Sequence, residues 1–199
     1  MSLSTIPCII FAGGKSSRMG TNKALLPFGP YKSLISYQVQ RLQKVFKEVY
    51  ISTKDQEVFS GIPAQIIEDT LFPDISAPST GFINIFKRLK DQDCFFVLSV
   101  DAPFVSESLI SKLLDLRSEK YEAIIVRTPS GIHPLCGIYS KALEKKFKEM
   151  IEKKDYKLKR LLDEANVFYM DVEDEKLLSN LNTPQQYKEA LVRADTIII

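Results

Sequence analysis

The segment IIFAGGKSSRMGTNKALLPFG, residues 9–29, places glycines and cations directly after a short apolar run. Glycine lets backbone N–H groups approach phosphate oxygens closely and take the positive φ angles of an anion-binding nest. Three cations share the segment: Lys15, Arg18 and Lys23. This combination predicts a site for a nucleoside triphosphate carrying Mg²⁺, and the alternative interpretation is a surface loop with solvated charges.

The spacing of the glycines excludes the two most familiar phosphate-binding loops. The dinucleotide fingerprint Gly-x-Gly-x-x-Gly needs a separation that the adjacent Gly13 and Gly14 do not have. The P-loop needs a glycine five residues before a Gly-Lys-Ser triplet, and Ile9 occupies that position. We therefore expect a phosphate-binding loop of another kind.

Asp101 is the carboxylate best placed to bind a metal ion. It follows Cys94–Val100, the most apolar of the predicted strands, and a carboxylate there is costly unless it binds a cation. Mg²⁺ prefers oxygen ligands and usually takes one or two protein carboxylates, with phosphates and water as its other ligands. We predict that Asp101 binds Mg²⁺, with Mn²⁺ as the alternative metal. Capping of the next helix is the competing role, which is weakened because Ser106 already fits it.

Apolar runs and helical patterns alternate along the chain, which indicates an α/β fold. Strands are predicted at Ile6–Phe11, Glu48–Thr53, Gln65–Glu68, Cys94–Val100, Glu122–Arg127, Leu135–Tyr139 and Val167–Val172. Helices are predicted after the Ser33 cap, over Thr80–Leu89, after the Ser106 cap, within Lys141–Ala165 and from Thr183-Pro184 to about Val192. We expect a Rossmann-like, doubly wound and mostly parallel sheet with helices on both faces. Such sheets bind ligands outside the carboxyl ends of their strands, where the glycine loop and Asp101 both fall.

The amino-acid composition and net charge exclude several classes of protein. The 199 residues, 45% of them hydrophobic, predict one domain over residues 1–199 with a substantial core. A net charge of only +2 argues against a nucleic-acid-binding protein, and we expect no membrane segment because no apolar run approaches roughly 18 residues. The three cysteines are widely spaced beside apolar residues, and the N-terminus does not suggest a secretory signal. We therefore expect free thiols and a cytoplasmic protein.

Five motifs in order along the chain resemble those of the molybdenum cofactor guanylyltransferases, the molybdopterin-guanine dinucleotide biosynthesis protein A family. They are Ala12-Gly13-Gly14 with Arg18-Met19-Gly20 and Lys23, then Ile67-Glu68-Asp69, Ala77-Pro78-Ser79-Thr80-Gly81, Val100-Asp101-Ala102-Pro103-Phe104, and Asn180 with Asn182-Thr183-Pro184. Two positions depart from the family pattern. Asn22 stands where aspartate commonly precedes the lysine, and Ala77 stands where the family has the first glycine of Gly-Pro-Leu-x-Gly.

The resemblance implies a fold of the nucleotide-diphospho-sugar transferase type and a nucleotidyltransferase activity. GMP would pass from GTP to the terminal phosphate of molybdenum-molybdopterin, with release of pyrophosphate and formation of the guanine dinucleotide cofactor. GTP and molybdenum-molybdopterin are then the small-molecule partners. The same resemblance implies molybdopterin-delivering proteins and molybdoenzyme chaperones as protein partners.

The resemblance also implies roles for individual residues. The catalytic set is Arg18, Lys23 and Asp101, with Asp101 as the metal ligand. The nucleotide-binding set is Phe11, Ala12, Gly13, Gly14, Lys23, Ser52, Asp69 and Asp101, and the pterin-side set is Asn180 and Asn182. Asp69 would accept hydrogen bonds from the guanine N1–H and amino group, and the alternative for it is a solvated loop acid. His133 is expected to be structural or on the substrate side, because an ionised attacking phosphate needs no general base.

The sequence is also compatible with three other functions. A cytidylyltransferase for the same pterin and a sugar-phosphate nucleotidyltransferase would share the glycine loop and the strand-end aspartate. A catalytically silent GTP-binding domain is the non-enzymatic alternative, and the joint presence of Lys23 and Asp101 argues against it. The basic region Lys141–Arg160 is assigned no site, since such runs are usually solvated helix surfaces.

Overall fold

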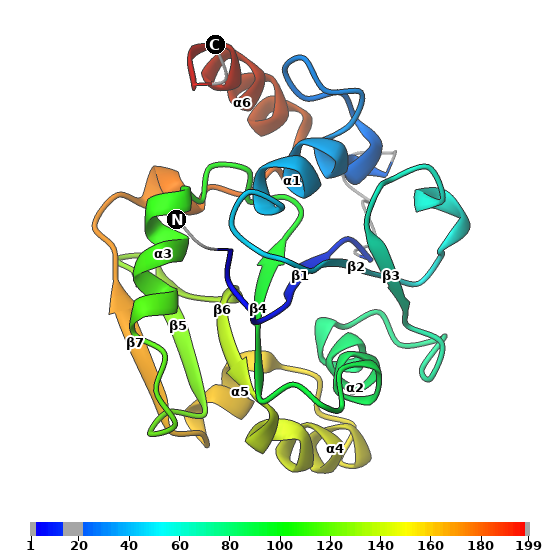
Figure 1. The fold of residues 1–199 in the computed structure, drawn as a ribbon, viewed down its shortest axis with the longest axis vertical. Helices are drawn as coiled ribbons and strands as arrows, with labels where there is room; N and C mark the ends of the chain where they lie inside the picture. The colour runs from blue at the N-terminus through cyan, green and yellow to red at the C-terminus, as the bar shows by residue number, and fades with distance from the viewer. Residues whose placement is uncertain (1–2, 14–21, 198–199) are drawn as a thin grey trace.

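The computed structural model describes residues 3–13 and 22–197, with the backbone alone for residues 195–197. Within these residues the fold is a seven-stranded sheet in the order β3-β2-β1-β4-β6-β5-β7 (Figure 1). The strands are β1 Cys8–Phe11, β2 Val49–Thr53, β3 Gln65–Glu68, β4 Cys94–Ser99, β5 Ala123–Thr128, β6 Gly131–Ser140 and β7 Val167–Asp171. All seven predicted strands are therefore present, with ends that shift by a few residues.

The sheet is mostly parallel, as predicted, but β6 runs against its neighbours. Strands β3, β2, β1 and β4 are paired in parallel, whereas β6 is antiparallel to both β4 and β5. Strand β6 also starts at Gly131, four residues before the predicted start at Leu135, because it forms a hairpin in which Thr128 pairs with Gly131. The periodic apolar pattern covers only the second half of this strand, so the sequence did not reveal its first half.

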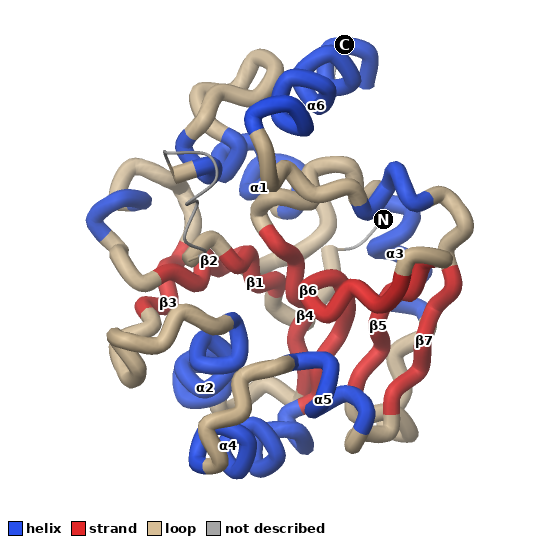
Figure 2. Tube along the Cα trace, turned by 180° about the vertical axis from the view of Figure 1, so that it is seen from behind, coloured by secondary structure: helices blue, strands red, loops and turns tan. Residues whose placement is uncertain are grey.

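Helices cover both faces of the sheet, as predicted (Figure 2). The α-helices are α1 Leu34–Leu42, α2 Pro78–Arg88, α3 Glu107–Asp115, α4 Glu144–Glu152, α5 Leu158–Asp163 and α6 Pro184–Ile197. Short 3₁₀ helices are η1 Lys23–Leu25, η2 Glu57–Phe59, η3 Lys141–Leu143 and η4 Glu175–Leu178. The predicted caps are confirmed, since the Ser33 and Ser106 hydroxyls accept hydrogen bonds from the backbone N–H groups of Ser36 and Leu109.

Two helices differ from the sequence prediction. The region Lys141–Ala165 is divided into η3, α4 and α5, with a break after α4 where Lys154 takes a φ of 55°. That left-handed backbone ends the helix although the lysine-rich sequence favours its continuation. Helix α6 extends to Ile197, beyond the predicted end near Val192.

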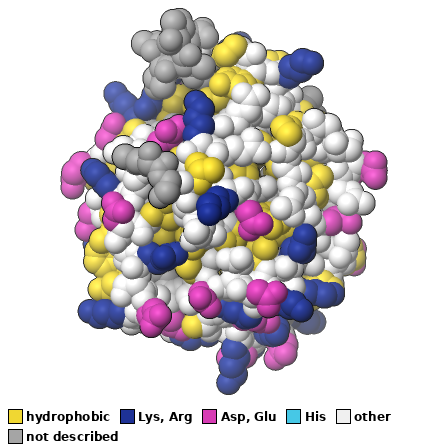
Figure 3. Space-filling view, in the orientation of Figure 1, with side chains coloured by type: hydrophobic (Ala, Val, Ile, Leu, Met, Phe, Trp, Pro, Cys, Tyr) yellow, Lys and Arg dark blue, Asp and Glu magenta, His cyan; other side chains and the backbone are white. Residues whose placement is uncertain are grey.

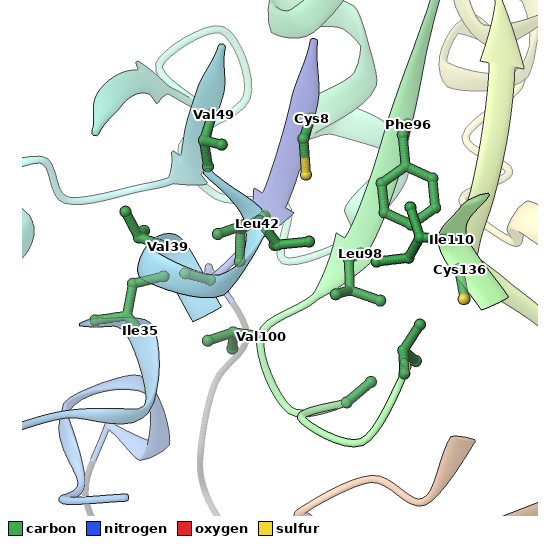
Figure 4. Close-up of a cluster of buried hydrophobic side chains, with 14 of the residues drawn as sticks. Cys8, Ile35, Val39, Leu42, Val49, Phe96, Leu98, Val100, Ile110 and Cys136 are labelled. Atoms are coloured by element: carbon green, nitrogen blue, oxygen red, sulfur yellow. The ribbon is translucent and has the colours of Figure 1, made fainter. Parts of the chain in front are cut away.

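Successive residues of each strand point to opposite faces of the sheet, and each face packs in its own hydrophobic core. In β1, Cys8 and Ile10 join the core beneath α1, α3 and α6, whereas Ile9 and Phe11 join the core above α2, α4 and α5. Figure 4 shows the first core, with residues of α1 packed over the strands. The Cys8 and Cys136 thiols are free and buried in it, and burial raises the pKa of Cys136 to about 12.

Charged side chains are mixed over the face drawn in Figure 3. Basic and acidic groups alternate there and are densest toward the edge formed by α4, whose sequence EKKFKEMIE carries both signs. In the described part of the chain, no helix combines the length and apolar character that crossing a bilayer would require.

Gly137 is the glycine whose replacement the sheet should tolerate least. A Cβ atom there would lie 2.3 Å from the Ile124 carbonyl oxygen and 2.8 Å from Ile125 Cδ1, beside the register shift between β5 and β6. We expect Gly137→Ala to lower the melting temperature by about 4–8 °C through overpacking. Gly61→Ala is the matched control, since nothing lies within 4 Å of its Cβ, and it should melt like the wild type. Equal melting temperatures for the two variants would contradict this account.

Candidate active site

The carboxyl ends of β1, β2 and β4 open into a pocket of about 230 Å³. Parallel strands bring these ends to one edge of the sheet, as the sequence predicted. The lining includes seven of the predicted site residues: Phe11, Ala12, Gly13, Lys23, Ser52, Asp69 and Asp101. Sequence reasoning missed other lining residues, among them Asn22, Thr53, Lys54, Ser99 and Leu135.

Lys23 and Asp101, which both line this pocket, form an ion pair. Lys23 Nζ donates to Asp101 Oδ2, and both side chains are largely buried, at 16% and 9% exposure. The other carboxylate oxygen, Oδ1, accepts a hydrogen bond from the Ser99 hydroxyl. A strand-end carboxylate was predicted to need a cation, and among the described residues the Lys23 ammonium provides a positive charge beside it.

Asn22, which stands where aspartate commonly precedes the lysine, still caps the turn that carries Lys23. Its Oδ1 accepts a hydrogen bond from Ala24 N at 3.1 Å and so caps η1, the turn that begins with Lys23. Aspartate and asparagine cap helices about equally well, because the cap needs a side-chain oxygen and no charge. Asparagine in place of aspartate at position 22 therefore keeps the cap that positions Lys23.

Asn180 and Asn182, the predicted pterin-side residues, lie on either side of a backbone contact to Asp101. The N–H of Leu181 donates to the Asp101 carbonyl at 3.0 Å. Asn182 Oδ1 accepts from Lys23 Nζ at 3.2 Å, so this residue lies beside the ion pair. Asn180 instead lines a second pocket. The two asparagines thus face different parts of the site.

The second pocket, of about 270 Å³, adjoins the first and shares Ser99, Asp101 and Leu135 with it. Residues 132–136 at the start of β6 form one wall, and Leu178 and Asn180 contribute from the other side. Asp101 therefore lines both pockets at this edge of the sheet. Ser99 could have been noticed in the sequence, because it is the polar residue of CFFVLSV two positions before Asp101.

His133 lies in the wall of the second pocket, a position compatible with the predicted substrate-side role. Its Nε2 is 2.9 Å from the Thr128 hydroxyl. Partial burial lowers the pKa of His133, while the negative charge of Glu175 acts in the opposite direction. Burial thus favours the neutral imidazole, which can take part in a hydrogen bond without carrying a positive charge.

Phe11, Ser52 and Gly81 meet at the end of the first pocket beside α2. A Cβ atom on Gly81 would lie 2.8 Å from Phe11 Cε1 and 3.1 Å from Ser52 Oγ. The Phe11 ring also packs on Phe82, with ring centroids 5.2 Å apart. Glycine at position 81 thus allows α2 to approach β1 and β2 closely.

Asp69 lines the pocket but its carboxylate already binds α2. Thr80 Oγ1 donates to one oxygen and Asn84 Nδ2 to the other, each at 2.7 Å. Burial raises the pKa of Asp69, and these hydrogen bonds together with Lys54 act in the opposite direction. The carboxylate therefore joins β3 to the first turns of α2, and each oxygen keeps one lone pair for another donor.

Two predicted site residues, Gly14 and Arg18, lie outside the described residues, as do Lys15 and Gly20. The described neighbours on both sides of that segment, Gly13 and Asn22, line the first pocket.

Comparisons with known proteins identify relatives of this chain. The model of the family described as MobA-like NTP transferase domain matches residues 8–168. A molybdenum cofactor guanylyltransferase of Campylobacter jejuni strain 81116 is 35% identical over 189 residues, which cover 95% of this chain and 97% of that protein. One from Helicobacter pylori strain G27 is 31% identical over 95% of this chain and 93% of that protein.

A solved structure shares the fold at lower identity. The crystal structure of molybdopterin-guanine dinucleotide biosynthesis protein A from Archaeoglobus fulgidus superposes with a TM-score of 0.82 at 20% identity, covering 96% of this chain and 100% of that one. The family match spans most of the chain and includes every strand of the sheet from β1 into β7. This chain belongs to the family of MobA-like NTP transferases.

Proposed function

We propose that this protein transfers GMP from GTP to the terminal phosphate of molybdenum-molybdopterin, releasing pyrophosphate and forming the guanine dinucleotide cofactor. The observation that carries the proposal is the Lys23–Asp101 pair in the lining of the first pocket, whose carboxylate also lines the adjoining second pocket. Similarity to guanylyltransferases over 95% of the chain supports the same function.

The first pocket is the proposed GTP site. Backbone groups of Phe11, Ala12 and Gly13 would contact the guanine, because donors and acceptors fixed by the fold can read a base edge. Ser52 lies at the same end of the pocket. Asp69 would accept from the guanine N1–H and amino group with the lone pairs that Thr80 and Asn84 leave free.

The second pocket is the proposed acceptor site. Asn180 and neutral His133 offer hydrogen bonds to a pterin, and apolar residues such as Leu135 and Leu178 pack beside them. Asn182, bound to Lys23, would place the acceptor phosphate next to the ion pair. That phosphate is ionised at neutral pH, so the protein need not remove a proton from it.

The chemical task of the protein is then positioning and charge stabilisation. Lys23 would neutralise charge on the phosphates of GTP as the acceptor oxygen attacks the α-phosphorus. Arg18, outside the described residues, is proposed to contact the departing pyrophosphate. Gly14 is proposed to contribute its backbone N–H to the phosphate cradle.

The donor set around Asp101 fits Mg²⁺, or Mn²⁺ as the alternative. Mg²⁺ commonly binds one protein carboxylate and takes its other oxygens from phosphates and water. Asp101 provides that carboxylate at the boundary of both pockets, with Ser99 fixing its orientation. When bound there, the metal would neutralise the phosphates electrostatically.

We also propose a setting for the reaction. The three free thiols agree with a reducing cytoplasm. Molybdopterin-delivering proteins and molybdoenzyme chaperones are the proposed protein partners, because the substrate must arrive and the product must be passed on.

Removing either member of the ion pair should abolish most of the activity. We expect Lys23→Ala and Asp101→Asn each to reduce turnover by about 10²–10³-fold, the usual effect of losing one electrostatic group at a reacting phosphate. Turnover is measured as pyrophosphate release with GTP, Mg²⁺ and molybdenum-molybdopterin. Lys148→Ala, an exposed α4 lysine paired with Glu144, is the control and should retain activity. Near-normal turnover of Asp101→Asn would contradict the metal assignment.

Base preference can be tested by melting the protein with Mg²⁺ and GTP, CTP, ATP or UTP. A ligand at 100 times its Kd adds about 2.7 kcal/mol, which corresponds to a rise of roughly 5–10 °C for a chain of this size. We expect GTP alone to produce the rise and Lys23→Ala to remove it. A response to CTP would indicate cytidylyl transfer, and GTP binding without turnover would indicate a silent GTP-binding domain.

Enlarging Gly81 should weaken GTP binding. The Cβ of Gly81→Ala would press on the Phe11 ring and displace it toward the proposed guanine position. A distortion of about 1–3 kcal/mol at that ring predicts a KM for GTP raised by about tenfold, with a smaller effect on kcat. Gly61→Ala serves again as the control. An unchanged KM would show that this end of the pocket does not hold the base.

A further inference from the structure

Helix α1 holds the loop that carries Asp101. Three backbone carbonyl groups within residues 100–105 accept hydrogen bonds from its side chains. The contacts are Gln38 Nε2 to Val100 O at 2.9 Å, Tyr37 Oη to Pro103 O at 3.3 Å and Arg41 Nη1 to Val105 O at 2.5 Å. Val100 directly follows β4 and Val105 lies two residues before α3, so α1 is bonded to the loop near both of its ends.

Gln38 and Arg41 also fix one another. Arg41 Nε donates to Gln38 Oε1 at 2.6 Å. Because its oxygen is bound to Arg41, the Gln38 amide must point its nitrogen at the Val100 carbonyl. Gln38 has no exposed surface and Arg41 is 8% exposed. The orientation is therefore set inside the protein and not by solvent.

Burying the charged guanidinium of Arg41 costs free energy of desolvation. Burial lowers the pKa of Arg41, and its Nη2 makes no hydrogen bond to any described residue. Apolar residues of similar volume often stabilise such positions at least as well as buried charges do. The placement of Arg41 is better explained by the loop that it anchors than by stability alone.

The same helix is tied to the segment that carries Lys23. Helix α1 begins at Leu34, whose N–H donates to the Leu26 carbonyl at 2.7 Å, directly after η1. One rigid element thus connects both members of the ion pair. Its start is joined to the Lys23 turn, and its later turns hold the Asp101 loop.

We propose that Gln38 and Arg41 are positioning residues for nucleotidyl transfer, which hold the Asp101 carboxylate in the orientation that binds Mg²⁺. They act through the carbonyl groups of residues 100 and 105 and do not touch the substrates. This inference rests on the proposed role of Asp101 as the Mg²⁺ ligand.

Gln38→Glu separates positioning from packing. The variant has nearly the same shape and keeps an acceptor for Arg41 Nε, but it replaces the donor to the Val100 carbonyl with an oxygen that repels it. Gln43→Glu is the matched control at the C-cap of the same helix, since Gln43 Nε2 donates to the Pro63 carbonyl at 2.8 Å in an exposed position. Arg41→Lys is the second test variant, because lysine keeps the charge and loses the fork that binds Gln38 and Val105 together.

The first readout is binding, measured as the Mg²⁺ concentration that gives half of the GTP-induced rise in melting temperature. The second is the Mg²⁺ dependence of turnover. We expect Gln38→Glu and Arg41→Lys to need about tenfold more Mg²⁺ in both, as loss of one hydrogen bond to a buried carbonyl predicts. Without ligands Gln38→Glu should melt within a few degrees of the wild type, and Gln43→Glu should match the wild type throughout.

The outcomes separate this inference from the proposed function. If the wild type responds to GTP and Mg²⁺ and both test variants follow the Gln43→Glu curve, the positioning role is wrong and the proposed function stands. If activity falls only in proportion to lost stability, with an unchanged Mg²⁺ requirement, the positioning role is also wrong. If the wild type itself shows no Mg²⁺-dependent response to GTP, the proposed function fails first. Should Gln38→Glu not fold, Arg41→Lys decides the question.

Discussion

The ion pair between Lys23 and Asp101 is the interaction on which the rest of the site depends. Removing two charges from water costs several kcal/mol per ion, and attraction between them offsets this only when their remaining hydrogen bonds are satisfied. Ser99 and Asn182 supply those bonds, one to each partner. The two charged residues are 78 positions apart in the sequence, so the pair exists because the fold places η1, which begins with Lys23, beside the carboxyl end of β4.

The direction of β6 determines what lies on the far side of that pair. Since β6 is antiparallel to β4, its first residues lie at the carboxyl end of β4 and next to Asp101. A parallel strand in this place would have put its last residues there. The reversed strand thus supplies His133 and Leu135 to the second pocket, while the parallel strands β1 and β2 supply the first. Two pockets of different composition therefore meet at one carboxylate.

Helices fix the site from both faces of the sheet. On one face Asp69 links β3 to Thr80 and Asn84 of α2, which closes the end of the first pocket. On the other face α1 holds the Asp101 loop, and the segment before α6 reaches the Asp101 carbonyl through Leu181. Side chains of α1 and α2 thus hold polar groups of the site in place, and such preorganisation is what electrostatic stabilisation of a transition state needs.

The sequence by itself determined the elements and the chemical types of the site. The apolar run of β4, the glycines after β1 and the caps at Ser33 and Ser106 are local features, because strand burial, backbone freedom and capping depend on near neighbours. The order of the strands, the reversal of β6, the partners of Asp69 and the role of Gln38 and Arg41 were decided only by the tertiary structure. Each of these depends on contacts between residues distant in the chain, and a side chain such as Arg41 looks like any surface arginine until the fold buries it.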